Sequence, residues 1–255
     1  MRILLVNANT SDYVTQKVAS AARTVVSPGT EVVAVTGEFG ANVIATRTEL
    51  AIANHACLDL LAKQSEGCDA AVIAVSYDVA LWAAREMLDI PVIGITEAAL
   101  LTACQLGTRI GVVMFGPRVL PVYQELAVSY GLASRIAGWR GVDTSAPYAA
   151  GNQDEADRLA IAAANSLVEQ DGCEVVVLAG AVMAGVPQRL QSQVPVPLLE
   201  GVSCAMLQAE SLIRLKLIKP RVGSLAALPA RAQVGLSDAL AARFGKNAPD
   251  RGDAA

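Results

Sequence analysis

Aromatic residues are scarce in this sequence, at 4% of 255 residues, and histidine occurs only once. Hydrophobic residues make up 53% of the chain, so Ala, Val, Leu and Ile must fill its interior. A long basic block is also missing and the net charge is only −4, which argues against nucleic-acid binding. The longest apolar run, Val175 to Pro187, contains glycines and is too short to span a bilayer, so we expect no membrane segment. The first residues lack a cleavable apolar segment, and we expect a cytoplasmic protein.

Clustered metal ligands are absent as well. The five cysteines are scattered without a C-x-x-C pair, and they are Cys57, Cys68, Cys104, Cys173 and Cys204. A zinc site needs ligands close together, so we expect no metal.

Short aliphatic runs alternate with helical stretches along the whole chain. The runs predict strands at 3–6, 31–35, 70–75, 92–95, 109–114, 175–178 and 197–199. The stretches between them predict helices at 11–25, 46–64, 80–88, 97–105, 119–130, 155–171 and 203–217. This alternation is typical of parallel sheets joined by crossover helices, and so of an α/β fold.

An internal repeat divides the chain. Residues 2–7 resemble 109–114, residues 67–75 resemble 172–180, and residues 91–97 resemble 197–203, each match about 105 residues apart. The repeat predicts two Rossmann-like halves related by a pseudo-twofold axis. We expect the first half at 1–100 plus about 205–244, the second at 101–204, and a disordered tail at 245–255.

Ligands of open α/β sheets bind at the carboxyl ends of the strands, so the cleft between the halves is the expected site. Its candidates are the residues that follow predicted strands. In the first half these are Asn7, Asn9, Thr10, Ser11, Val75, Ser76, Tyr77, Asp78 and Glu97. In the second half they are Phe115, Gly116, Arg118, Gly180 and Ala181.

Several segments together resemble one enzyme family. Val6-Asn7-Ala8-Asn9-Thr10 is similar to the N-P-N-[TS] opening of the hydantoin racemase group, within the aspartate/glutamate racemase superfamily. The segments 72–78, 83–86 and 91–99 resemble its central motif, and 177–181 and 199–202 resemble its second-half motif. The resemblance covers roughly residues 1–240 and implies two Rossmann-like halves, with no metal and no organic cofactor.

The same resemblance exposes a departure from the family. Its racemases place one cysteine from each half on opposite faces of the substrate, so that one thiolate removes a proton while the other thiol delivers one. The matching positions here are Val75 and Gly180, which cannot transfer protons. Two-thiol racemisation is therefore not expected.

Other groups then have to carry the chemistry. Asp78 and Glu97 are the acid/base candidates, although a carboxylate at a helix start also serves as a cap, Asp78 for the helix beginning near Ala80. Ser76 is a candidate oxyanion donor and Tyr77 a hydrogen-bond donor. Asn7, Asn9, Thr10 and Ser11 suit substrate binding, and Thr10 or Ser11 also suits a helix N-cap. Arg118 suits a substrate carboxylate, or simply solvent.

We therefore predict a cofactor-independent enzyme that acts on a small carboxylate or cyclic amide. Isomerisation by groups other than cysteine, ring-opening hydrolysis and decarboxylation stay open, as does a ligand-binding protein without catalysis. The expected partner is a small molecule, and analogy with compact α/β proteins favours a homo-oligomer.

Overall fold

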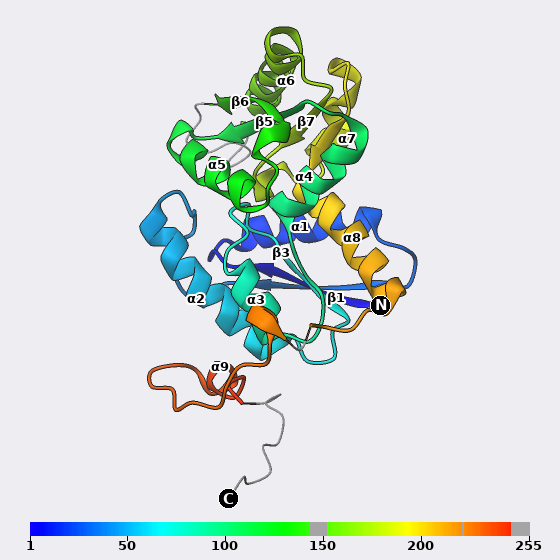
Figure 1. The fold of residues 1–255 in the computed structure, drawn as a ribbon. Coiled ribbons are helices and arrows are strands. Elements are labelled where there is room, and N and C mark those ends of the chain that lie inside the picture. The colour runs from blue at the N-terminus through cyan, green and yellow to red at the C-terminus, as the bar shows by residue number, and fades with distance from the viewer. Residues whose placement is uncertain (143–151, 221, 246–255) are drawn as a thin grey trace, which may run out of the picture.

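A computed structural model describes residues 1–142, 152–220 and 222–245. In this part of the chain, two parallel sheets of four strands have the same order. The first is β2-β1-β3-β4, with β1 (Arg2–Asn7), β2 (Glu31–Thr36), β3 (Ala70–Ile73) and β4 (Val92–Gly94). The second is β6-β5-β7-β8, with β5 (Ile110–Phe115), β6 (Ile136–Val142), β7 (Val175–Leu178) and β8 (Leu198–Glu200). The predicted α/β class with two similar halves is confirmed (Figure 1).

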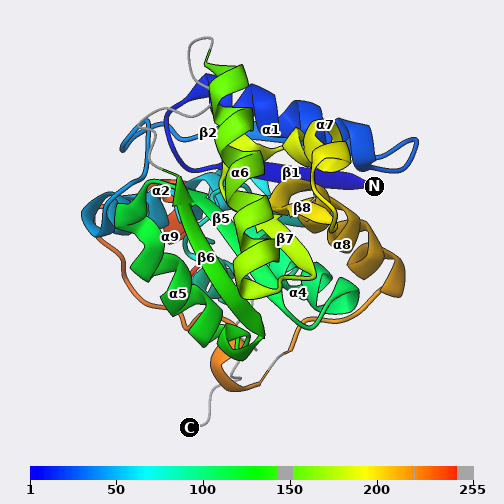
Figure 2. The same cartoon turned by 90° about the horizontal axis from the view of Figure 1, so that it is seen from above.

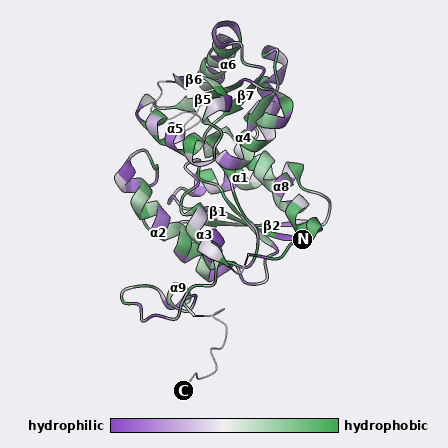
Figure 3. Ribbon diagram, viewed as in Figure 1, coloured by the Kyte–Doolittle hydropathy of each residue, from purple (hydrophilic) through white to green (hydrophobic). Residues whose placement is uncertain are grey.

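Helices cover both sheets, as crossover connections between parallel strands require. They are α1 (Asp12–Val25), α2 (Arg47–Gln64), α3 (Leu81–Met87), α4 (Ile95–Leu106), α5 (Leu120–Ser129), α6 (Gln153–Asp171), α7 (Val186–Leu190), α8 (Gly201–Leu215) and α9 (Asp238–Ala241). All residues of β3 and β7 are buried, because helices pack on both faces of each sheet (Figures 1–3).

Every predicted strand and helix is present, with ends shifted by a few residues, but β6, α7 and α9 were not predicted. The sequence of β6, Ile-Ala-Gly-Trp-Arg-Gly-Val, is not a continuous aliphatic run. Gly138 is needed there, because a Cβ at this position would lie 2.7 Å from side-chain atoms of Leu167 and Asp171 on α6. Because packing against α6 requires glycine here, β6 lacks the continuous aliphatic run from which a strand is predicted.

The first turns of α4 and α8 meet where the two halves touch. A Cβ added at Gly201 would lie 2.4 Å from the carbonyl oxygen of Ile95, so only glycine permits this approach. Both helices begin directly after the last strand of their sheet. Their amino ends therefore lie together at the carboxyl ends of the strands.

The segment after α8 returns to the first half. Lys219 Nζ donates to the carbonyl of Glu86, and Ser237 on the border of α9 donates to Asp59 of α2. Arg243 donates to the carbonyl of Ala62, 2.7 Å away. The expected boundary between the halves stays a prediction, and the expected tail lies outside the described residues from position 246 onward.

Candidate active site

The loop after β3 is tightly folded and buried. Val75 and Ser76 are only 5% and 6% exposed. Asp78 and Ala80 have φ angles of 46° and 56°, in the left-handed region that residues other than glycine seldom adopt. Such strain persists only where surrounding contacts hold it, and it clusters at functional sites.

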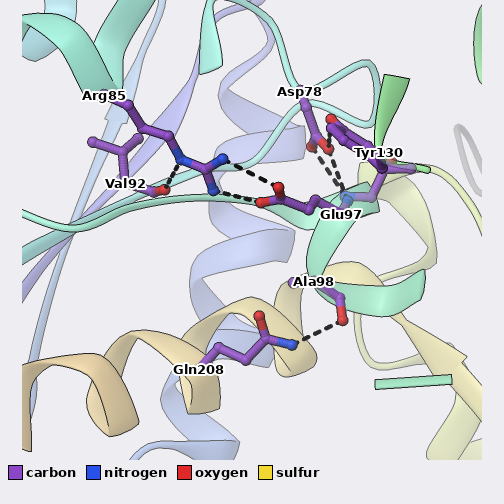
Figure 4. A network of polar contacts seen from close by, with 8 residues as sticks. Asp78, Arg85, Val92, Glu97, Ala98, Tyr130 and Gln208 are labelled. Atoms are coloured by element: carbon purple, nitrogen blue, oxygen red, sulfur yellow. Dashed lines mark hydrogen bonds and ion pairs between the residues drawn. The ribbon is translucent and has the colours of Figure 1, made fainter. Parts of the chain in front are cut away.

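The carboxyl group of Asp78 fills the amino end of α4. It accepts hydrogen bonds from the N–H groups of Thr96 at 3.0 Å and Glu97 at 2.8 Å. The hydroxyl of Tyr130, which follows α5 in the second half, donates to the same carboxyl at 2.7 Å (Figure 4). Asp78 therefore caps α4, and the alternative that it caps the helix beginning near Ala80 is wrong, since the N-cap of α3 has no side-chain hydrogen bond.

Burial raises the pKa of Asp78 to about 7, because the ionised form loses its hydration. The three hydrogen bonds oppose this rise. Asp78 is therefore partly ionised near neutral pH.

Glu200 is the capping carboxylate of the second half, as Asp78 is that of the first. At the end of β8 it accepts from the N–H groups of Val202 at 2.6 Å and Ser203 at 2.9 Å, and so caps α8. Burial raises its pKa as well. The strand registers make Glu200 the equivalent of Gly94, since each pairs with the last residue of the central strand beside it. Sequence reasoning missed Glu200, although a carboxylate between a strand and a glycine signals a cap.

A small cavity of about 10 Å³ lies between the strand ends of the two halves. Its walls are Ser76, Ile95, Thr96, Ala99, Val177, Leu178, Ala179, Gly180 and Gly201. This space is about the size of one water molecule. The cavity brings together two predicted site residues, Ser76 from the first half and Gly180 from the second.

Ser76 stands out among the cavity walls. Its hydroxyl is buried and makes no well-formed hydrogen bond within the described residues, although it lies close enough to the Tyr123 hydroxyl to lower the pKa of that tyrosine. A buried hydroxyl without a well-formed hydrogen bond is costly, so Ser76 is a candidate group for binding a ligand. The main-chain carbonyl of Ser76 accepts from the Thr96 hydroxyl, which fixes the loop to α4.

Gly180 leaves space on the opposite wall. Its φ angle is 130°, and a Cβ there would have no neighbour nearer than 3.5 Å. Val75, at the matching place after β3, is an apolar and buried residue. Ala181 begins a short 3₁₀ turn, Ala181–Met183, and is half-buried.

A larger pocket of about 260 Å³ lies beside this cavity. It is formed by the start of α2 from the first half and the start of α5 from the second. The lining residues are Ala45, Thr46, Arg47, Thr48, Leu50, Tyr77, Arg118, Val119, Pro121 and Val122. The pocket thus unites the predicted residues Tyr77 and Arg118. Sequence reasoning missed residues 45–50, because a long irregular stretch separates them from β2.

Tyr77 lines the larger pocket. It follows Ser76 directly, and its ring packs against that of Tyr123 with centroids 5.3 Å apart. Burial raises the pKa of Tyr77 to about 12, so its phenol stays protonated and can donate a hydrogen bond.

Other predicted residues do not line either cavity. Asn7 is fully buried and donates to the Asn9 side chain at 2.8 Å and to Thr15 Oγ1 at 3.0 Å. Ser11 is the N-cap of α1, as one alternative held, and the Thr10 N–H donates to Ala41. This loop is therefore closed by bonds among its own residues.

Two further groups also lie apart from the cavities. Glu97 is bound by Arg85, whose Nη1 is 3.1 Å from its carboxylate and whose guanidinium also donates to Val92 (Figure 4). Phe115 ends β5, and the N–H of Gly116 donates to Val142 at 2.9 Å.

None of the five cysteines lines the cavity or the pocket. Cys68 and Cys173 precede β3 and β7, and so lie at the opposite end of the sheets. Burial raises the pKa of Cys204 to about 11. The described residues also contain no cluster of metal-ligating side chains, and no helix among them is long and apolar enough to cross a membrane.

The comparisons with known proteins agree with this architecture. Residues 3–209 match the family model described as Asp/Glu/Hydantoin racemase. A hydantoin racemase of Paenarthrobacter aurescens is 32% identical over 217 residues, covering 84% of this chain and 92% of that protein. The allantoin racemase structure from Klebsiella pneumoniae is 33% identical with a TM-score of 0.88, covering 94% of this chain and 98% of that one. That from Pseudomonas fluorescens is 33% identical with a TM-score of 0.84, covering 92% and 100%. The chain belongs to the Asp/Glu/hydantoin racemase family of enzymes.

Proposed function

We propose that this protein is a cofactor-independent enzyme that removes and returns the α-proton of a small cyclic amide without using thiols. The buried hydroxyl of Ser76, which makes no well-formed hydrogen bond and shares a cavity with Gly180, is the observation that carries this proposal. When an α-proton leaves, negative charge develops on the neighbouring carbonyl oxygen. A hydroxyl already in place stabilises that oxygen without having to reorganise.

Main-chain donors support the same role. The N–H groups of Ser76 and Tyr77 after β3, and of Ala181 and Val182 after β7, have no hydrogen-bond partner among the described residues. A substrate seated between the two strand ends would meet donors from both halves. The proposed donors thus occupy equivalent places in the two halves, after β3 and after β7.

Asp78 is the acid/base group that we expect to take up and return the α-proton, through the one water molecule for which the cavity has room, and so to set the pH dependence. It does not line the cavity, but it holds the N–H of Thr96, which does. Its pKa of about 7 makes its charge change in the range where the enzyme would work. Glu97 is less suited, because its carboxylate is already held by Arg85.

Proton NMR in D₂O with purified protein tests the reaction directly. The substrates are hydantoin, allantoin, aspartate and an arylmalonate, each with a control that lacks protein. The proposal predicts deuterium at the α-carbon of a cyclic amide faster than in the control, without new products. Binding without any exchange in the whole panel contradicts it and indicates a ligand-binding protein.

A second candidate is hydrolytic ring opening or decarboxylation. The space beside Gly180 favours hydrolysis, because it is large enough for one water molecule next to the donors. In the same NMR experiment this candidate predicts ring-opened or decarboxylated signals. Such signals would show that the protein catalyses this second reaction and not the proposed isomerisation.

The variants Asp78→Asn and Glu97→Gln separate the two carboxylates. We expect the rate of the wild-type enzyme to change with an inflection near pH 7, and Asp78→Asn to abolish that inflection. Glu97→Gln should keep it. An inflection that persists in Asp78→Asn and disappears in Glu97→Gln would show that Glu97 sets the pH dependence.

A further inference from the structure

The strand-end cavity alone does not accommodate a hydantoin-sized ring. Its volume is about 10 Å³, whereas the pocket that Tyr77 lines has about 260 Å³. We expect a substrate that reaches Ser76 to place the rest of its structure in the larger pocket, because Tyr77, which lines that pocket, follows Ser76 directly. The lining of that pocket then decides which substituents the enzyme accepts.

The charged groups of the pocket differ in their partners. Arg47 is neutralised, because its guanidinium forms two hydrogen bonds to Glu125 of α5, one of them 2.8 Å long. Arg118 makes no hydrogen bond or ion pair with another described residue. Arg118 is thus the lining cation that is left for a ligand.

The pocket lining contains no acidic side chain. The carboxylate of Glu49 interacts electrostatically with Arg118, and it accepts from the N–H of Ala45 at 2.8 Å. This hydrogen bond and the Thr46 hydroxyl lower the pKa of Glu49, and Arg118 adds a smaller effect. Glu49 is therefore engaged with the backbone and does not occupy the guanidinium.

We infer that the pocket around Arg118 binds a carboxylate substituent of the substrate. This inference rests on the proposed function and names the substrate class: small cyclic amides that carry an acidic side group. Arg118 pairs with the carboxylate, which it can hold with two parallel hydrogen bonds. The Tyr77 phenol and the hydroxyl of Thr48 line the same pocket and supply further donors.

A matched pair of ligands tests the charge. Hydantoin-5-acetate and its neutral counterpart hydantoin-5-acetamide have almost the same size and differ in the group that would face Arg118. Isothermal titration calorimetry of the wild-type protein should show about tenfold tighter binding of the acetate. That preference should shrink as salt is added, because the guanidinium is exposed to solvent. Equal affinity for the two ligands would overturn the inference.

Two variants locate the preference. Arg118→Gln should bind both ligands with equal affinity. Arg158→Gln removes the same charge from the exposed surface of α6, where Arg158 pairs with Glu155, and should keep the tenfold preference. A preference for the acetate that persists in Arg118→Gln would refute the role of this residue.

The readout is binding, so it does not depend on the reaction. An acetate preference that Arg118→Gln removes, in a protein without α-proton exchange, would support the pocket and refute the proposed function. Exchange by the wild-type protein without a preference between the two ligands would support the proposed function and refute the role of the pocket.

Discussion

The carboxyl group of Asp78 occupies the space that a side chain at Gly94 would need. A Cβ at position 94 would lie 2.4 Å from Asp78 Cγ and 2.6 Å from its Oδ1. In the second half the equivalent of Gly94 is Glu200, which supplies the capping carboxylate itself. Both halves therefore bury one carboxylate at the amino end of the helix that faces the cleft, but from different positions.

Gly94→Ala should displace Asp78 from the start of α4. Overpacking of this kind costs about 1–3 kcal/mol, to which the broken cap adds. Urea unfolding should also show that the cost falls when Asp78 is shortened to Ala in the same chain, because the two positions compete for one space. Fully additive losses in the double variant would contradict the contact.

Asp78 should make the protein less stable as the pH rises from about 4 to about 7. Its pKa is raised by burial from 3.8 to about 7, so its contribution to the free energy of unfolding is fully present below the unfolded value and is lost by the pH at which the buried group ionises. Linkage sets an upper bound of about 4 kcal/mol on this loss. Urea unfolding of wild type and Asp78→Asn between about pH 4 and pH 8.5 measures it, and the difference between the two proteins isolates this group. Parallel curves would show that Asp78 does not titrate in this range.

Tyr130→Phe should move the inflection of the pH–rate profile to higher pH. The Tyr130 hydroxyl donates to the Asp78 carboxylate and lowers the pKa of that group, so its loss favours the protonated acid. We expect the inflection of the rate to move above its wild-type position, with about 1–2 kcal/mol lost from the free energy of unfolding. An unchanged inflection would mean that the hydrogen bond does not act on Asp78.

Thiols can be reintroduced at the two positions where the family resemblance expects them. Val75→Cys should fold well, because it replaces one buried apolar residue by a smaller one. At Gly180→Cys there is room for the side chain, but the φ angle of 130° is one that residues other than glycine rarely adopt. This variant should therefore lose about 1–3 kcal/mol from its free energy of unfolding.

The double variant should exchange α-protons faster than wild type and lose this gain after treatment with a thiol-alkylating reagent. A gain that survives alkylation would show that the thiols are not responsible.

Much of the fold could be predicted because buried parallel strands leave continuous aliphatic runs, as in β3 and β7. The strand β6 left no such run, since the close packing of α6 requires glycine at position 138. Within the site, Ser76 and Gly180 could be predicted from their places after central strands.

Partners far apart in the sequence could not be predicted in the same way. The pairing of Glu97 with Arg85 and that of Asp78 with Tyr130 depend on where helices of different segments end. The hydrogen bonds of Asn7 are local, to Asn9 and Thr15, but the sequence does not show whether its amide faces these neighbours or a ligand. The residues of the pocket at the start of α2 were missed because a long irregular stretch separates them from β2.

The central claim is that the Ser76 hydroxyl stabilises the charge that develops on the substrate. The most direct test is the rate of α-deuteration of a cyclic amide substrate by Ser76→Ala, beside Ser129→Ala as a control on the exposed end of α5. The account predicts a loss of about 100-fold in Ser76→Ala, with ligand affinity kept and with Ser129→Ala equal to wild type. A Ser76→Ala protein that folds, binds and exchanges protons at the wild-type rate would contradict it.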